Sequence, residues 1–236
     1  ADDARLAYVT PAHQYPLGVE LSIERRKALL AWAQRRDAYV LEDDYDGDYR
    51  YQGRPIASLQ GMDEHGRVIY IGSFNKILFP ALRVAYAIVP EPLVAAFVDA
   101  KHVADGHTAL LMQGALAAFI HEGHLGRHLR KTRTIYDERR IAFLDEARAL
   151  AEVLEFGPAI AGMHVTARFA GAAAALDDRA VAAACAQAGV AVHPLSKYGD
   201  CAPGGLVFGF AGATAQVSRA DLARVRRAIE TTLNPA

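Results

Sequence analysis

Val68-Ile-Tyr-Ile-Gly-Ser-Phe-Asn-Lys76, continuing to Pro80 and Arg83, joins an apolar run to a short polar loop that carries one lysine. Residues 68–71 are continuously apolar and are bounded by polar residues, a pattern that favours a buried β-strand. A glycine, a hydroxyl, an amide, an amine and then a guanidinium follow its carboxyl end. Ligands of open α/β sheets bind beyond the carboxyl ends of the strands. The stretch therefore predicts that Lys76 attaches an aldehyde cofactor covalently.

The composition favours a folded protein with a sizeable core, because 52% of the 236 residues are apolar and 22% are charged. Lys and Arg number 26 against 27 Asp and Glu, which excludes a global basic field for nucleic acid within these residues. Two cysteines without metal-ligand spacing, Cys185 and Cys201, predict reduced thiols. Residues 1–5 lack the apolar core of a signal peptide, and no apolar run approaches the roughly 20 residues that span a bilayer. We expect a cytoplasmic protein without membrane contact.

The first 90 residues predict an α/β sheet. Strands are expected at residues 6–10, 38–41, 68–71 and 84–89. A helix capped by Ser22 separates the first two strands, and this βαβ start favours a parallel sheet. The link between the last two strands is too short for a helical crossover, so the fourth strand is expected to run antiparallel. The basic residues of the helix are expected to face solvent: Arg25, Arg26, Lys27, Arg35 and Arg36.

The rest of the chain predicts a helical stretch and then a smaller α+β unit. Residues 91–151 have a helical pattern with breaks near Gly106 and Gly123. Beyond them we expect strands at 162–169, 190–193 and 206–210, a helix at 178–188, and a last helix that runs to 233 from a capping box of Ser218 and Asp221. We assign residues 1–130 to a large domain with a mostly parallel sheet and residues 131–236 to a small α+β C-terminal domain.

Three predicted strand ends bring residues 10–15, 43–45 and 73–76 to one rim of the sheet. Each group has a plain alternative, since a lysine after a strand is usually solvated and an aspartate pair is often a turn former or a metal ligand. The combination of acid, phenol, hydroxyl, amine and guanidinium instead suits pyridoxal phosphate. A deprotonated lysine forms an imine with the aldehyde, a carboxylate keeps the pyridine nitrogen protonated, and a guanidinium pairs with phosphate.

Four runs, at residues 10–18, 42–51, 70–76 and 123–130, together carry a family resemblance. They closely resemble the MocR-type transcriptional regulators, in which a winged-helix DNA-binding region of the GntR class is fused to a domain similar to fold-type-I, pyridoxal phosphate-dependent aminotransferases. The resemblance covers nearly the whole chain and implies the fold-type-I architecture, with part of the large domain followed by the small one.

The resemblance also implies roles for individual residues. Lys76 would be the Schiff-base lysine, Asp43 would pair with the pyridine nitrogen, and Tyr45 would reach the phenolic oxygen of the ring. Ser73 and Arg83 would hold the phosphate. Residues 13–15 lie where related aminotransferases place an asparagine near the ring.

Three departures from the family pattern bear on function. Asn75 replaces the usual serine before the lysine, although its amide can still donate to phosphate. Val207 lies near the place where aminotransferases have an arginine for the substrate carboxylate, and Arg168 is the nearest basic residue on a strand. Family members also carry a DNA-binding region and roughly the first third of the aminotransferase-like domain ahead of Thr10. We therefore expect the full-length parent to bind the cofactor and this fragment to bind it weakly or not at all.

The sequence thus favours the effector-sensing domain of a regulator. Its expected partners are a second copy of the chain, DNA through an N-terminal domain not present here, and a small amine or amino acid. The alternative is a fragment of a working class I/II aminotransferase, and a third reading is a fold-type-I remnant without cofactor. The glutamate-aspartate-aspartate-tyrosine-aspartate run at 42–46, together with Val207, favours the regulator.

Overall fold

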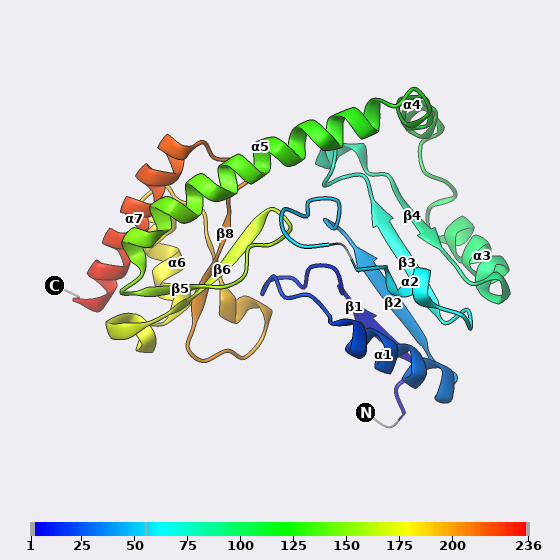
Figure 1. Ribbon diagram of the computed structural model, residues 1–236, viewed down its shortest axis with the longest axis horizontal. Helices are drawn as coiled ribbons and strands as arrows, with labels where there is room; N and C mark the ends of the chain where they lie inside the picture. Colours follow the sequence, from blue (N-terminus) through cyan, green and yellow to red (C-terminus); the bar gives the residue numbers. More distant parts are fainter. Residues whose placement is uncertain (1–2, 55, 235–236) are drawn as a thin grey trace. The chain divides into compact units, whose positions relative to one another are not determined.

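The computed structural model describes residues 3–54 and 56–234. Its chain forms two compact units (Figure 1). One consists of Ala1–Gln14 and Val19–Lys131, and the other of Tyr15–Gly18 and Thr132–Ala236. The chain passes between the units on either side of Tyr15–Gly18 and again within helix α5 (His124–Ala147).

The sheet of the first unit contains β1 (Leu6–Val9), β2 (Tyr39–Asp44), β3 (Val68–Ser73) and β4 (Ala85–Ile88), in that order. The first three strands are parallel, and β4 pairs with β3 in the antiparallel direction. All four strands lie where the apolar runs predict them, and the antiparallel direction of the fourth is confirmed.

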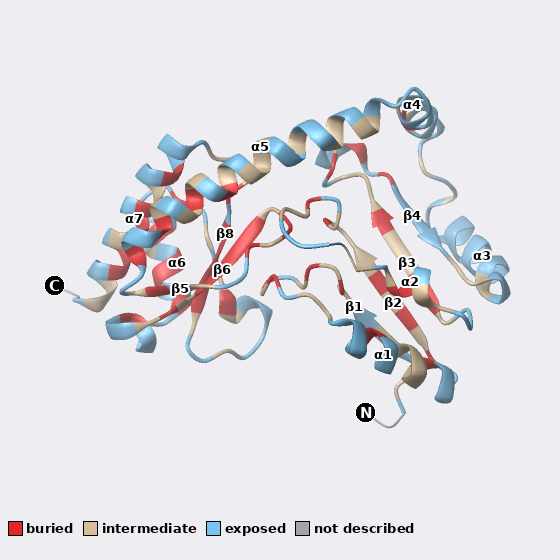
Figure 2. Ribbon diagram, viewed as in Figure 1, coloured by how far each residue is buried: buried red, intermediate tan, exposed pale blue. Residues whose placement is uncertain are grey.

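Helix α1 (Ile23–Arg35) begins at Ser22, whose hydroxyl accepts a bond of 3.4 Å from the main-chain N–H of Arg25. Its Ala33 packs with Val40 of β2 and Val68 of β3 in a buried cluster. The cluster also contains the first residue of a short helix that the sequence pattern does not predict, α2 (Leu59–Met62). Figure 2 shows the buried residues of this sheet concentrated along β2 and β3.

Arg26 departs from the prediction that the basic residues of α1 face solvent. Its side chain is only 1% exposed, and its guanidinium donates to the main-chain oxygens of Leu21 at 2.8 Å, Ala57 at 3.0 Å and Pro11 at 2.7 Å. It lies one turn before the apolar residues of the helix and thus on the buried face. The guanidinium is tolerated there because three chain segments supply acceptors.

Three helices follow the sheet: α3 (Val94–Asp105), α4 (Leu110–His121) and α5. The predicted breaks are confirmed, because Gly106 and Gly123 have left-handed φ values of 68° and 73°, which favour glycine. None of the described helices combines the length and the apolar character that crossing a membrane requires. Short 3₁₀ helices occupy Pro80–Leu82, Glu91–Leu93, Arg148–Leu150, Gly171–Ala175 and Leu195–Tyr198.

The sheet of the second unit is antiparallel, in the order β5-β6-β8-β7. Its strands are β5 (Leu154–Phe156), which the pattern does not predict, β6 (His164–Phe169), β7 (His193–Pro194) and β8 (Gly205–Gly209). The strand predicted at 190–193 is wrong for its first three residues, since pairing begins only at His193.

Two helices complete this unit, α6 (Asp178–Gln187) and α7 (Ala215–Leu233). The helix predicted at 178–188 is confirmed, but the capping box at Ser218 is wrong. Helix α7 begins at Ala215 after Thr214, so Ser218 lies inside it and is buried with Leu222 and Val225. The buried stripe extends one turn further toward the N-terminus than a capping box would allow, and packing therefore overrides the local capping signal.

Candidate functional site

The predicted rim exists, because the carboxyl ends of three parallel strands share one edge of the first sheet (Figure 1). In the register of β2 and β3, Asp43 lies beside Ile71, and Tyr45 and Ser73 lie at or just beyond the strand ends. Strand β4 enters from the same edge, where Ala85 pairs with Ser73. Arg83, two residues before Ala85, therefore also belongs to this edge.

The acidic run at the end of β2 divides into structural and candidate functional members. Glu42 is buried, and its carboxylate accepts the main-chain N–H groups of Leu59 at 2.9 Å and Gln60 at 2.8 Å, which begin α2. Asp44 accepts the hydroxyl of Tyr70 at 2.8 Å and the N–H of Gly47 at 3.0 Å. Both carboxylates are thus engaged with the fold.

Asp43 points to the other face of the sheet, because successive side chains of a strand alternate. The hydroxyl of Tyr8 on β1 donates a hydrogen bond to its carboxylate. Partial desolvation and the bond to Asp43 raise the pKa of Tyr8 to about 12, so the phenol keeps its proton and remains a donor at neutral pH. Sequence reasoning missed Tyr8, although the period-two pattern of its strand places it on the face of Asp43.

Tyr45 and Asp46 both contact His13 in the loop after β1. The Tyr45 hydroxyl donates to the main-chain oxygen of His13 at 2.9 Å, and the Asp46 carboxylate lies 3.0 Å from the His13 Nδ1 atom. The structure therefore joins the first and second strand ends of the rim by side-chain contacts. The sequence assigns no role to residues 13–15, whereas in the structure His13 contacts both Tyr45 and Asp46.

The loop that carries the lysine is held by its own polar groups. The hydroxyl of Ser73 accepts the N–H of Asn75 at 3.2 Å, and the amide oxygen of Asn75 accepts the N–H of Val84 at 3.2 Å. Asn75, predicted to donate to phosphate, thus has its oxygen committed to the loop. Lys76 and Arg83, between these anchors, are both exposed.

The backbone of Arg83 is unusual, with φ 51° and ψ 38° in the left-handed region. Residues other than glycine rarely adopt this conformation, and such backbone outliers cluster at functional sites. Gly72 marks a second close approach, because a Cβ atom there would lie 2.3 Å from the ring of Tyr86 on β4. Backbone geometry on both sides of the lysine loop is therefore tightly constrained.

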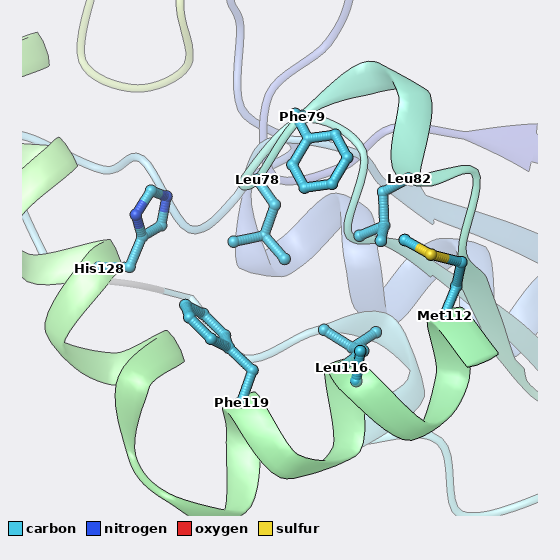
Figure 3. A pocket seen from close by; sticks show the side chains of 8 residues that line it. Leu78, Phe79, Leu82, Met112, Leu116, Phe119 and His128 are labelled. Carbon is cyan, nitrogen blue, oxygen red and sulfur yellow. The ribbon is translucent and has the colours of Figure 1, made fainter.

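An apolar pocket of about 340 Å³ lies against the same loop (Figure 3). Leu78, Phe79 and Leu82 form one wall and residues of α4 the other. His128 closes one end, and its Nε2 atom lies 2.7 Å from the main-chain oxygen of Ile77. The lining includes none of the residues predicted to bind the cofactor.

The fold is that of an aminotransferase-like domain, and the sequence comparison gives the family. The model of the family "Aminotransferase class I and II" matches residues 9–224, and the chain belongs to this family. It is 40% identical over 227 residues to the probable rhizopine catabolism regulatory protein MocR of Rhizobium meliloti, covering 95% of this chain and 45% of the relative. It is 32% identical over 232 residues to the pyridoxine biosynthesis regulator PdxR of Corynebacterium glutamicum, covering 96% of this chain and 49% of the relative.

The solved structures give the same result for the fold. Pyrococcus horikoshii kynurenine aminotransferase, crystallised with PMP, matches with a TM-score of 0.87 at 26% identity, over 96% of this chain and 56% of that one. The predicted resemblance to MocR-type regulators and the aminotransferase-like α/β fold are both confirmed. The chain spans about half the length of the curated relatives that it matches.

Proposed function

We propose that the chain is the pyridoxal phosphate-binding, effector-sensing part of a transcriptional regulator. The observation that carries the proposal is the exposed Lys76 on a constrained loop at the edge that also holds Asp43, Ser73 and Arg83. The extensive similarity to MocR and PdxR supports the regulatory side of the proposal.

The chemistry of the rim fits the cofactor. Lys76 would hold the aldehyde carbon, Asp43 the ring nitrogen, Tyr45 the phenolic oxygen, and Ser73 with Arg83 the phosphate. The bond from Tyr8 already orients the Asp43 carboxylate. When bound, pyridoxal phosphate supplies an electron sink. Asn75 supports this set by fixing the loop through Val84, and a contact of its remaining amide donors with phosphate stays a prediction.

A working aminotransferase of class I/II is the second candidate, and the family match favours it. Within the second unit, Val207 of β8 is buried and pairs with Thr166, so this strand offers no cation at the predicted place. Arg168 of β6 donates to the main-chain oxygen of Pro203 at 3.2 Å, a structural contact. Absence of a carboxylate-binding arginine at that strand position supports sensing of an amine or amino acid rather than efficient turnover.

The regulatory part of the proposal includes DNA contact through an N-terminal domain outside these residues, in a cytoplasmic protein. The test is the reading frame upstream of the chain. We expect it to encode a winged-helix region followed by the first part of the aminotransferase-like domain. A frame that encodes the aminotransferase-like part without any DNA-binding region would favour the enzyme instead.

We also propose that the protein is a homodimer and that α3 and α4 belong to the interface. Figure 2 shows both helices as largely exposed, and α4 has apolar residues on all sides, which is typical of a buried helix. Its Leu111 is 83% exposed, and Val103 of α3 is 85% exposed. Exposed apolar side chains of this kind, and the apolar pocket beside Phe79, are typical of protein–protein contacts.

Replacing Leu111 with glutamate is expected to convert dimers to monomers, because a charge within an apolar interface is desolvated without a partner. Sedimentation velocity of wild type and variant measures this. Val217→Glu, at an exposed apolar residue of α7, is the matched control and should leave the dimer intact. A dimer that persists in Leu111→Glu would show that this surface is not the interface.

A further inference from the structure

A buried pair, His13 and Asp46, lies directly behind the rim of the first sheet. The two residues are 1% and 2% exposed. The Nδ1 atom of His13 lies 3.0 Å from Asp46 Oδ2 and 3.2 Å from Asp46 Oδ1, so this ring nitrogen faces both carboxylate oxygens. None of the roles assigned to the rim uses this pair.

Burial of such a pair is costly. Burial raises the pKa of Asp46, against the hydrogen bond and charge of His13, which lower it. The desolvation of two polar groups often cancels the gain from their attraction, so replacing a buried pair with apolar residues can be neutral. A plain structural explanation, that the pair only ties two loops together, therefore accounts poorly for its presence at this place.

The third member of the cluster is Tyr45, which precedes Asp46 in the chain. Its hydroxyl donates to the main-chain oxygen of His13 at 2.9 Å and lies 3.3 Å from His13 Nδ1. The two rings are 6.3 Å apart between centroids. Two consecutive residues thus contact the same histidine. Asp46 contacts the imidazole ring of His13, and Tyr45 bonds to the main-chain oxygen of His13. The phenol therefore contacts both the main chain and the ring of the histidine that Asp46 holds.

The cluster also reaches the lysine. The charge of Lys76 acts on the Asp46 carboxylate, as does the opposing charge of Asp44. Asp46 therefore shares an electrostatic environment with Lys76, while its direct contact is with His13.

We infer that His13 and Asp46 are positioning residues that hold the Tyr45 hydroxyl at the rim, from where its single O–H would turn from the His13 carbonyl to the cofactor. The inference rests on the proposed function, because Tyr45 needs a ligand at the rim to act on. It assigns to His13 and Asp46 a task that acts through Tyr45 rather than a direct contact with the cofactor.

The test is a double-mutant cycle in the full-length protein, with the dissociation constant for pyridoxal phosphate measured by absorbance. Asp46→Ala and Tyr45→Phe are each expected to weaken binding roughly three- to tenfold, the range for one lost hydrogen bond. The dissociation constant of the double variant should be no larger than that of the single variant with the larger loss. Both changes disrupt the same contact between Tyr45 and the His13–Asp46 pair. Asp46→Asn, which can still accept from His13, should recover most of the loss.

A second readout needs no cofactor. In protein labelled with ¹³C-tyrosine, the Cζ resonance of Tyr45, assigned by its absence in Tyr45→Phe, should move in Asp46→Ala. Glu20→Gln is the matched control, because Glu20 forms an ion pair with Arg50 at 2.9 Å in the same unit, and both side chains are largely buried. It should lower the melting temperature without moving this resonance.

Three outcomes separate the ideas. Losses that multiply fully in the double variant would overturn the positioning role. So would an unmoved Tyr45 resonance in Asp46→Ala, even with a lowered melting temperature, since that describes a structural tie alone. A wild-type protein that does not bind pyridoxal phosphate would instead overturn the proposed function itself.

Discussion

Replacing Arg26 with methionine is expected to lower the free energy of unfolding by about 3–5 kcal/mol, because the lost hydrogen bonds are partly offset by removing the desolvation cost of the buried guanidinium. Methionine is unbranched and fits an apolar environment, but it is shorter than arginine and has no N–H donor. The main-chain oxygens of Leu21, Ala57 and Pro11 would each lose a hydrogen bond from a charged group. Such bonds contribute about 1.5–3 kcal/mol each, and buried acceptors left unpaired add a desolvation cost.

Trp32 provides the measurement, since it is the only tryptophan of the chain and packs against the core that α1 covers. Its fluorescence in urea reports on the first unit. Arg25→Met, one residue earlier and exposed, is the control and should change stability by less than about 0.5 kcal/mol. Equal midpoints for the two variants would show that the three bonds of Arg26 contribute little.

Replacing Lys76 with alanine is expected to abolish the shift to longer wavelength that the absorbance of pyridoxal phosphate undergoes with the full-length wild-type protein. The alanine cannot form the imine on which that spectral shift depends. The fold should be unaffected, because the lysine side chain is exposed on its loop. The measurement is a titration with cofactor followed from 300 to 500 nm (about the range of such chromophores).

Lys101→Ala is the matched control for this variant. Lys101 is an exposed lysine of α3 that pairs with Asp105 one turn later, and it lies outside the rim. We expect its titration to match that of wild type. If Lys76→Ala retained the wild-type absorbance, the cofactor would be attached elsewhere, and the proposed roles of Asp43 and Arg83 would fall with it.

The sheet and its rim could be predicted from sequence because their signals are local. Apolar runs mark β1 to β4, and the short link before β4 excludes a parallel crossover. The acidic run was harder to divide. Alternation along β2 separates Asp43 from Glu42 and Asp44. The partners of the last two, which are α2 for Glu42 and Tyr70 for Asp44, come close only in the folded chain.

Other features depend on tertiary contacts that no local pattern shows. Arginine side chains usually face solvent. Arg26 can be buried because main-chain oxygens of segments distant in sequence accept its hydrogen bonds. Thr214 precedes α7 without a side-chain cap bond. The N-terminal end of α7 is therefore set by packing of its buried face, which includes Ser218. His13 and Asp46 are 33 residues apart in sequence, and nothing in either segment predicts their pairing.

The most direct test of the central claim is to locate the cofactor on the chain. Full-length protein would be incubated with pyridoxal phosphate, reduced with borohydride, digested and analysed by mass spectrometry. We expect a single phosphopyridoxyl group on the peptide that contains Lys76, and much weaker labelling when the 236-residue chain is treated alone. A label on another lysine, or none on the full-length protein, would contradict the assignment of this rim as a pyridoxal phosphate site.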